Sequence, residues 1–153
     1  MTLLLLSIAQ AEEYKTYCNA RFGYCIDYAS DLIPGGESQN GDGQVFESKE
    51  KNGTELTVYG TNNALNTTFE KLFKDELKSF KKDGSDVTLK KQTKTEIIIS
   101  GFKDKGTRIF YKKILKGDGE FFIMILEYAK SDKEKLDTIV THIAKSFKPA
   151  QKG

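Results

Sequence analysis

The chain has 153 residues, of which 38% are hydrophobic and 30% charged, and its 24 basic and 22 acidic side chains leave a net charge of +2. This composition argues against a disordered chain and against a polytopic membrane protein, and the length suits one domain with its own hydrophobic core. The near balance of charge disfavours a nucleic-acid partner, and lysine pairs such as Lys90-Lys91 are interpreted as solvated side chains.

The first residues predict an export signal. Residues 1–11 form an apolar run that ends in Ala9-Gln10-Ala11, a small-x-small cleavage site, although the basic residues that usually open a signal are missing. The run is too short to be a transmembrane segment, which takes about 20 apolar residues. We therefore expect a signal peptide cleaved near Ala11 and a mature bacterial protein that is periplasmic or secreted. An N-terminal strand or core segment is the alternative interpretation.

Both cysteines, Cys18 and Cys25, lie in the stretch Tyr17–Tyr28, where apolar and polar residues alternate on either side of Asn19–Gly23. This pattern predicts a β-hairpin with a short loop. In an exported chain, two cysteines close in sequence indicate one structural disulfide. A redox pair usually has two intervening residues instead of six, and a zinc site would need more ligands than the single histidine supplies.

After the hairpin, a Pro- and Gly-containing segment leads into a polar loop that ends at Gly43. A second hairpin is expected from Gln44–Ser48 and Thr54–Gly60. An amphipathic helix is expected over Thr67–Lys82, where Thr67 and Glu70 have the spacing of a capping box and Gly84 supplies the stop. Packing of this helix on a sheet is favoured over a membrane-surface role.

Four consecutive strands and a second helix follow. Short, turn-rich connections predict an antiparallel meander. The expected strands are Val87–Lys91, Thr95–Phe102, Thr107–Leu115 and Glu120–Tyr128, and the expected helix is Asp132–Phe147, with Ser131 and Glu134 at capping-box spacing and Pro149 as its stop.

The segment Phe121–Leu126 is apolar at every position, so both of its faces should be covered. Two amphipathic helices are available to cover them. The sequence therefore predicts a single α+β domain over residues 12–153, with an antiparallel β-sheet flanked by helices on both faces, an α/β/α sandwich.

This order of elements, together with the segments Arg21–Tyr28 and Asn40–Phe46, resembles the PsbP-like fold and small exported bacterial proteins of that fold that are mostly uncharacterised. The fold occurs in a lumenal subunit of photosystem II and in a yeast Ran-binding transport factor. The resemblance implies a binding or assembly role, because known members act mainly in that way. It brings no catalytic residues to carry over.

The candidate partner-binding loop is the hairpin turn, with Asn19, Arg21 and Phe22 as its candidate residues and the neighbouring loop 32–43 beside it. Recognition residues are common on loops held by a rigid scaffold, and an exposed Arg–aromatic pair is typical of an interface anchor. Phe22 could equally lie in the core. The expected function is a non-enzymatic protein-binding or assembly-accessory role in the bacterial envelope, and the alternative is a small-ligand or lipid carrier with a cleft between sheet and helix.

No residues in the sequence form a recognisable nucleophile, metal or cofactor site, so no enzyme activity, no metal and no cofactor are predicted. The only histidine, His142, is expected on the solvent side of its helix. The segment Ser38–Gly43 begins like a calcium loop, but Lys49 stands where a bidentate Glu is needed. Asn52 lies in an acidic-x-Asn-x-Thr glycosylation pattern, which is a weak signal.

Overall fold

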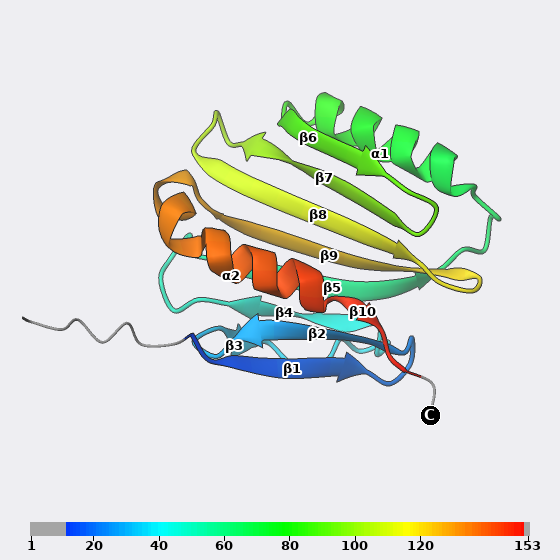
Figure 1. Cartoon of the computed structure of the whole chain (residues 1–153), viewed down its shortest axis with the longest axis horizontal. Coiled ribbons are helices and arrows are strands. Elements are labelled where there is room, and N and C mark those ends of the chain that lie inside the picture. Colours follow the sequence, from blue (N-terminus) through cyan, green and yellow to red (C-terminus); the bar gives the residue numbers. More distant parts are fainter. Residues whose placement is uncertain (1–11, 152–153) are drawn as a thin grey trace, which may run out of the picture.

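The structure is a computed structural model that describes residues 12–151, so the predicted signal peptide, residues 1–11, lies outside the described residues. The described part forms a seven-stranded sheet, a three-stranded sheet and two α-helices (Figure 1). No helix within it is long and apolar enough to cross a membrane. In chain order the elements are β1 (Tyr14–Asn19), β2 (Tyr24–Ala29), β3 (Ile33–Pro34), β4 (Gly43–Glu47), β5 (Glu55–Asn62), α1 (Phe69–Lys82), β6 (Asp86–Gln92), β7 (Glu96–Lys103), β8 (Arg108–Lys116), β9 (Glu120–Ala129), a short 3₁₀ helix (Lys130–Asp132), α2 (Lys133–Ser146) and β10 (Lys148–Pro149).

The seven-stranded sheet is antiparallel throughout and has the order β3-β4-β5-β9-β8-β7-β6. The predicted meander is confirmed as β6 to β9, and β9 lies inside the sheet between β5 and β8. Four consecutive residues of β9, Phe121–Met124, are buried. Because successive side chains of a strand point to opposite faces, both faces of the sheet must be covered at β9, as the apolar run predicted.

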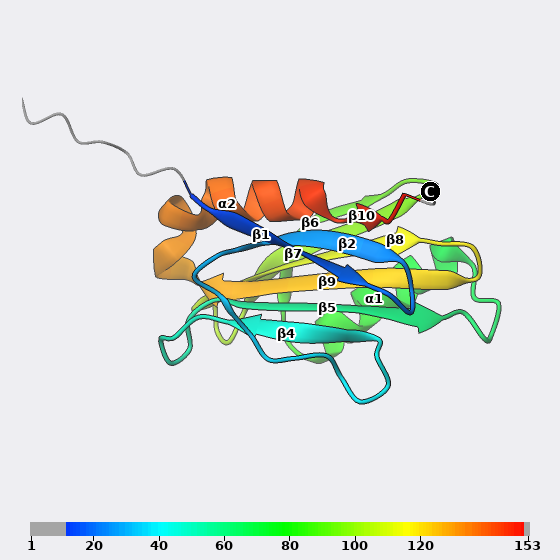
Figure 2. The same ribbon diagram turned by 90° about the horizontal axis from the view of Figure 1, so that it is seen from below.

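The two faces of this sheet carry different layers. On one face, α1 packs over a cluster that includes Phe69, Ile97 and Phe110. On the other face, α2 lies beside β2 of the β1–β2 hairpin, and Figure 2 shows α2 and β2 together on the same side of β9, β5 and β4. The predicted arrangement of helices on both faces is therefore correct. What the sequence did not predict is that the hairpin forms a second sheet, of order β1-β2-β10, which shares the face of α2.

The second sheet depends on a very short strand near the end of the described chain. β10 pairs with β2 through Lys148 opposite Cys25 and Pro149 opposite Tyr24, and the Ala150 amide donates to the Gly23 carbonyl. Pro149 was predicted only to stop the second helix. It also stands in an edge strand, a position that proline tolerates because its missing amide is not needed there.

Helix ends differ in detail from the sequence expectations. The N-cap of α1 is Thr68, whose hydroxyl accepts from the Lys71 amide, and not Thr67. The N-cap of α2 is Asp132, which makes no side-chain cap hydrogen bond, and the preceding 3₁₀ turn supplies a backbone bond from the Lys133 amide to the Lys130 carbonyl. Gly84 ends α1 as predicted, with a φ of +81° that a residue with a side chain rarely adopts.

Candidate functional site

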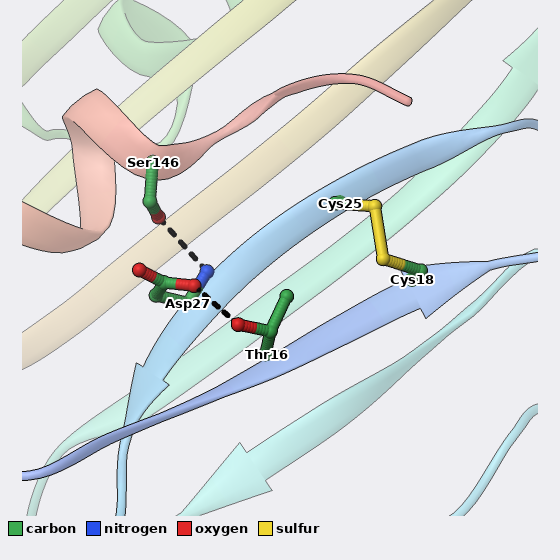
Figure 3. Close-up of a disulfide and its surroundings, with 5 residues drawn as sticks. All are labelled: Thr16, Cys18, Cys25, Asp27 and Ser146. Carbon is green, nitrogen blue, oxygen red and sulfur yellow. Dashed lines mark hydrogen bonds between the residues drawn. A yellow bond between two sulfur atoms is a disulfide. The ribbon is translucent and has the colours of Figure 1, made fainter. Parts of the chain in front are cut away.

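The β1–β2 hairpin is closed by a disulfide. Cys18 and Cys25 are directly opposed in the register, with a Cα–Cα distance of 4.1 Å, and their sulfur atoms are bonded at 2.09 Å (Figure 3). This pairing agrees with the sequence prediction. The bridge lies on the outward side of the hairpin, where Cys18 is exposed. It holds the two strands together immediately before the turn that contains the candidate binding residues.

Asn19 organises this turn from a buried position. Its side chain is only 2% exposed, and its amide nitrogen donates to Glu37 Oε1 at 2.7 Å and to the Gly41 carbonyl at 2.9 Å. Its Oδ1 accepts from the Phe22 backbone amide at 2.8 Å. Asn19 is predicted from the sequence as a contact residue of the loop, whereas in the structure its side chain is buried and holds the turn from inside. A buried amide must satisfy its polar atoms, and here it does so by joining the turn to the next loop.

Arg21 and Phe22 stand at the tip of the same turn. Arg21 is exposed, and its guanidinium donates to the Asn40 carbonyl and lies 5.1 Å from the centre of the Phe22 ring. Phe22 is half-buried and packs against the hydrophobic core, with its ring over Gly60 of β5. A Cβ at Gly60 would come within 2.3 Å of the Phe22 ring, so only glycine permits this approach. Phe22 therefore combines the two alternatives: it is anchored on the core and still partly accessible.

The loop that faces the turn, residues 37–42, is held by its own contacts. The Ser38 hydroxyl bonds to the Asp42 carboxylate, and this hydrogen bond lowers the pKa of Asp42. The Asp42 carbonyl accepts from the Tyr24 hydroxyl at 2.9 Å and from the Gly60 amide at 2.9 Å. We call the turn 20–23 and the loop 37–42 together the clamped loop surface. Its two halves come from different parts of the chain and are fixed by hydrogen bonds to each other and to the sheet.

A second group of polar residues connects the hairpin to α2, and the sequence did not predict it. His142 of α2 is exposed, as expected, but its Nε2 lies 2.8 Å from Asp27 Oδ2 and its ring stacks on Tyr14 at 3.7 Å. Thr16 donates to the other oxygen of Asp27, and the Asp27 amide donates to the Ser146 hydroxyl (Figure 3). Periodicity within α2 indicated only that His142 is on a polar side. It could not show that the hairpin lies there.

The hydrogen bonds among these residues hold α2 against the hairpin. Burial raises the pKa of Asp27, but hydrogen bonds from Thr16 and His142 and the nearby positive charges lower it more, so that the net shift is downward. The group borders an open cleft of about 630 Å³. Both neighbouring hydroxyls are engaged elsewhere: Thr16 donates to Asp27, and Ser146 donates to the Ile143 carbonyl. Neither hydroxyl is hydrogen-bonded to the His142 imidazole, whereas an activated hydroxyl nucleophile is hydrogen-bonded to its base.

A separate cavity of about 240 Å³ lies between the first half of α2, the end of β2 and the β4–β5 connection. Its floor is apolar and includes side chains from the sheet and from α2. Ser48 also lines it, and the buried hydroxyl of Ser48 has no hydrogen-bond partner in the part of the chain that the structure describes. Several carboxylates stand at its rim. The cavity lies between the sheet and α2, where a carrier of small ligands would need a cleft, and a carrier role stays a prediction.

Asn52 lies in the turn between β4 and β5. Its φ is +59°, its side chain is exposed, and its carbonyl accepts from the Arg108 guanidinium at 2.6 Å. Arg108 thus fixes the backbone of the turn, while the Asn52 side chain is exposed to solvent. Glycosylation of Asn52 stays a prediction.

Comparison with known proteins establishes the fold of the protein. No family model matches the chain, and no curated protein matches it by sequence. Solved structures do match over nearly the whole chain. The cyanobacterial PsbP of Synechocystis superposes with a TM-score of 0.65 at 13% identity, covering 92% of this chain and 95% of that chain. The Ran-binding protein Mog1p of Saccharomyces cerevisiae superposes with a TM-score of 0.61 at 5% identity, covering 92% and 97% respectively.

A further neighbour is LpqN of Mycobacterium tuberculosis, a protein involved in cell envelope biogenesis, with a TM-score of 0.53, 14% identity and 93% coverage of both chains. At these identities the likeness concerns the fold alone. The protein is therefore an α+β protein of the PsbP-like fold, as its element order indicated, and this fold also occurs in other small bacterial proteins.

Proposed function

We propose that this protein is an exported, non-enzymatic binding or assembly-accessory protein, and that the clamped loop surface binds a protein partner in the cell envelope. The observation that carries this proposal is the fixed position of Arg21 and Phe22. Arg21 is exposed over a ring that is itself seated on Gly60, and the turn beneath them is tied by the disulfide and by Asn19. Arginine and aromatic residues supply much of the binding energy at protein interfaces.

Preorganisation is the physical reason to favour this surface over other loops. Binding through a mobile loop costs free energy when the loop is ordered, about 0.5–1.5 kcal/mol for each immobilised side chain. Here the turn and the loop 37–42 are already joined through Asn19 and through Arg21, which donates to Asn40. A partner would meet a surface that needs little further ordering. An acidic group beside an apolar or aromatic one would complement Arg21 and Phe22.

The fold neighbours support a binding role without identifying a partner. One of them is a Ran-binding protein, and another is involved in cell envelope biogenesis. Export is supported by the disulfide, since such bonds persist in oxidising compartments. The export signal predicted for residues 1–11 has the same implication.

Site-specific crosslinking tests the proposed surface. A photoreactive amino acid replaces exposed Ala20 in the turn, and in a control protein it replaces exposed Lys78 on α1, on the opposite face of the sheet. We expect crosslinking to a defined envelope protein in the native cell from position 20 only. The Arg21→Ala variant should lose this product at unchanged folded fraction, whereas Lys78→Ala should keep it.

Two results would contradict the proposal. One is crosslinking of equal yield from both positions, which would show that the turn has no special role. The other is a catalytic activity of the purified protein that disappears in the His142→Ala variant without unfolding, which would place function at the link between Asp27 and His142. N-terminal sequencing tests export separately: a mature chain that begins at Glu12 is expected, and an intact Met1 in a cytosolic fraction would refute it.

A further inference from the structure

The cavity beneath α2 has the composition of a small-molecule site. Its volume of about 240 Å³ leaves room for several water molecules. Its lining includes a compact set of buried apolar side chains from β9, α2 and the segment after β2: Leu32, Leu126, Ile139, Val140 and Ile143. An apolar floor of this kind accepts the hydrocarbon part of a ligand and offers nothing to hold a highly polar one.

The rim of the cavity has a strongly acidic character. Glu12, Asp31, Glu50 and Asp132 stand at the opening, and Lys135 is the one basic side chain that lines it in the described part of the chain. The whole protein is slightly basic, with a net charge of +2, so this acidic rim is a local feature. Even in a chain that begins at Glu12, whose α-amino group would add one positive charge, the carboxylates outnumber the cations by four to two.

Ser48 provides a third feature at the same place. It lines the cavity, and its buried hydroxyl has no partner within residues 12–151. Burying a hydroxyl without a hydrogen bond is unfavourable, so such a group usually indicates a water molecule or a ligand that supplies the missing partner. A hydroxyl oxygen can accept a hydrogen bond from an ammonium group.

We propose that this cavity binds a small ligand with an apolar body and a positively charged amine. The hydrocarbon would occupy the floor formed by β9 and α2, and the ammonium group would lie among the rim carboxylates. The charge of the rim decides the class: an anionic amphiphile such as a fatty acid would meet repulsion from four carboxylates, and a neutral one would gain nothing from them. This site lies at the opposite end of the hairpin from the turn 20–23, and it is independent of the proposed protein-binding function.

Three probes of equal length test this assignment: n-hexylamine, n-hexanol and n-hexanoate. Each is titrated into the disulfide-bonded protein at pH 7, and binding is followed by NMR shifts of the Leu126 and Ile143 methyl groups. We expect hexylamine to bind at least ten-fold more tightly than hexanoate, with hexanol between them. The preference for the amine should weaken as salt is raised, since screening acts on the rim charges.

Variants locate the effect at the rim. Replacing two exposed rim residues together, Asp31→Asn with Glu50→Gln, should weaken hexylamine binding several-fold and leave hexanol binding unchanged. Glu134→Gln is the matched control, because Glu134 is an exposed acid of α2 that does not line the cavity, and it should change neither. Arg21→Ala should also leave amine binding intact, which separates this site from the clamped loop surface.

Three outcomes would overturn the proposal. The first is hexanoate or hexanol binding as tightly as hexylamine, which would make the site a general apolar cavity. The second is hexylamine binding that the Asp31→Asn, Glu50→Gln variant leaves unchanged. The third is no shift of the lining methyl groups with any probe, up to the solubility limit. If the double variant loses stability, its hexanol affinity serves as the internal control, because a distorted cavity would lose both ligands.

Discussion

The two faces of the large sheet are built in different ways. On one face, α1 packs through a stripe of apolar side chains, and Phe69 is its only buried residue. On the other face, α2, the hairpin and β10 come from opposite ends of the chain and are joined by a shared apolar core and by polar contacts such as Asp27 with His142. Each face closes an apolar core. The face of α2 and the hairpin also contains the disulfide, the clamped loop surface and the cavity, so the face assembled from distant segments holds the candidate sites.

The largest expected difference between the faces concerns their aromatic residues. Phe46 is 0% exposed, and its ring lies 4.3 Å from that of Tyr28, whereas Phe80 of α1 is half-buried and stacks on Phe110 at 4.4 Å. Phe46→Ala should lower the free energy of unfolding by about 3–5 kcal/mol. Phe80→Ala should cost about 1–2 kcal/mol, because less apolar surface is lost from the core. Urea denaturation measures both free energies of unfolding. An equal loss of stability in the two variants would contradict the expected difference between the aromatic residues of the two faces.

Removal of the disulfide should have the next largest effect. Replacing Cys18 and Cys25 by Ser should lower stability by about 2 kcal/mol, because the unfolded chain is then no longer restrained by the short loop. Mass spectrometry of the unreduced wild type should show a mass about two units below the reduced form and no covalent dimer. Crosslinking from Ala20 should also weaken beyond the loss of folded protein. Free thiols in the exported protein would contradict the role assigned to the hairpin.

Asn19 tests whether the turn and the loop 37–42 act as one unit. In Asn19→Ala, the Glu37 carboxylate, the Gly41 carbonyl and the Phe22 amide each lose a partner. We expect a loss of about 1–3 kcal/mol and faster hydrogen exchange in both loop segments. Hydrogen exchange in α1 should be unchanged apart from the global shift in stability. Faster exchange in the turn alone would show that the two segments are not coupled.

The smallest effect concerns the polar link between the hairpin and α2. Since the pKa of Asp27 is lower in the folded protein than its ordinary value of 3.8, its contribution to stability is present above about pH 4 and is lost as the pH falls through the folded-state value. Asp27→Asn should therefore destabilise the protein at pH 6 by less than about 1 kcal/mol, in the range of partly exposed ion pairs.

The pH series supplies the control for this prediction. The difference in unfolding free energy between the wild type and Asp27→Asn should shrink as the pH is lowered from 6 to 3, because the carboxylate becomes protonated. The turn variant Asp118→Asn, at an exposed residue that forms no ion pair within the described chain, should show no such trend. A difference for Asp27→Asn that stays constant over this range would contradict a charged link.

The sequence by itself determined the local elements and the two-sided sheet. The alternation in Thr54–Gly60, the helical stripe of Thr67–Lys82 and the apolar run of Phe121–Leu126 each correspond to an element of the structure. These patterns are reliable because their apolar residues recur every two or every 3.6 positions, so that each pattern is complete within one short segment of the chain. The disulfide was predictable for the same reason, since Cys18 and Cys25 are seven positions apart.

Only the tertiary structure decided what those elements enclose. Asp27 and His142 are 115 positions apart, and β10 reaches β2 across most of the chain. Asn19 is a polar residue in a turn by its sequence, yet it is buried because the loop 37–42 closes over it. The cavity likewise needs α2, β2 and the β4–β5 connection to meet. Local periodicity specifies which face of a segment is apolar, but the partner that covers this face is fixed by packing among distant segments, which no pattern of neighbouring residues records.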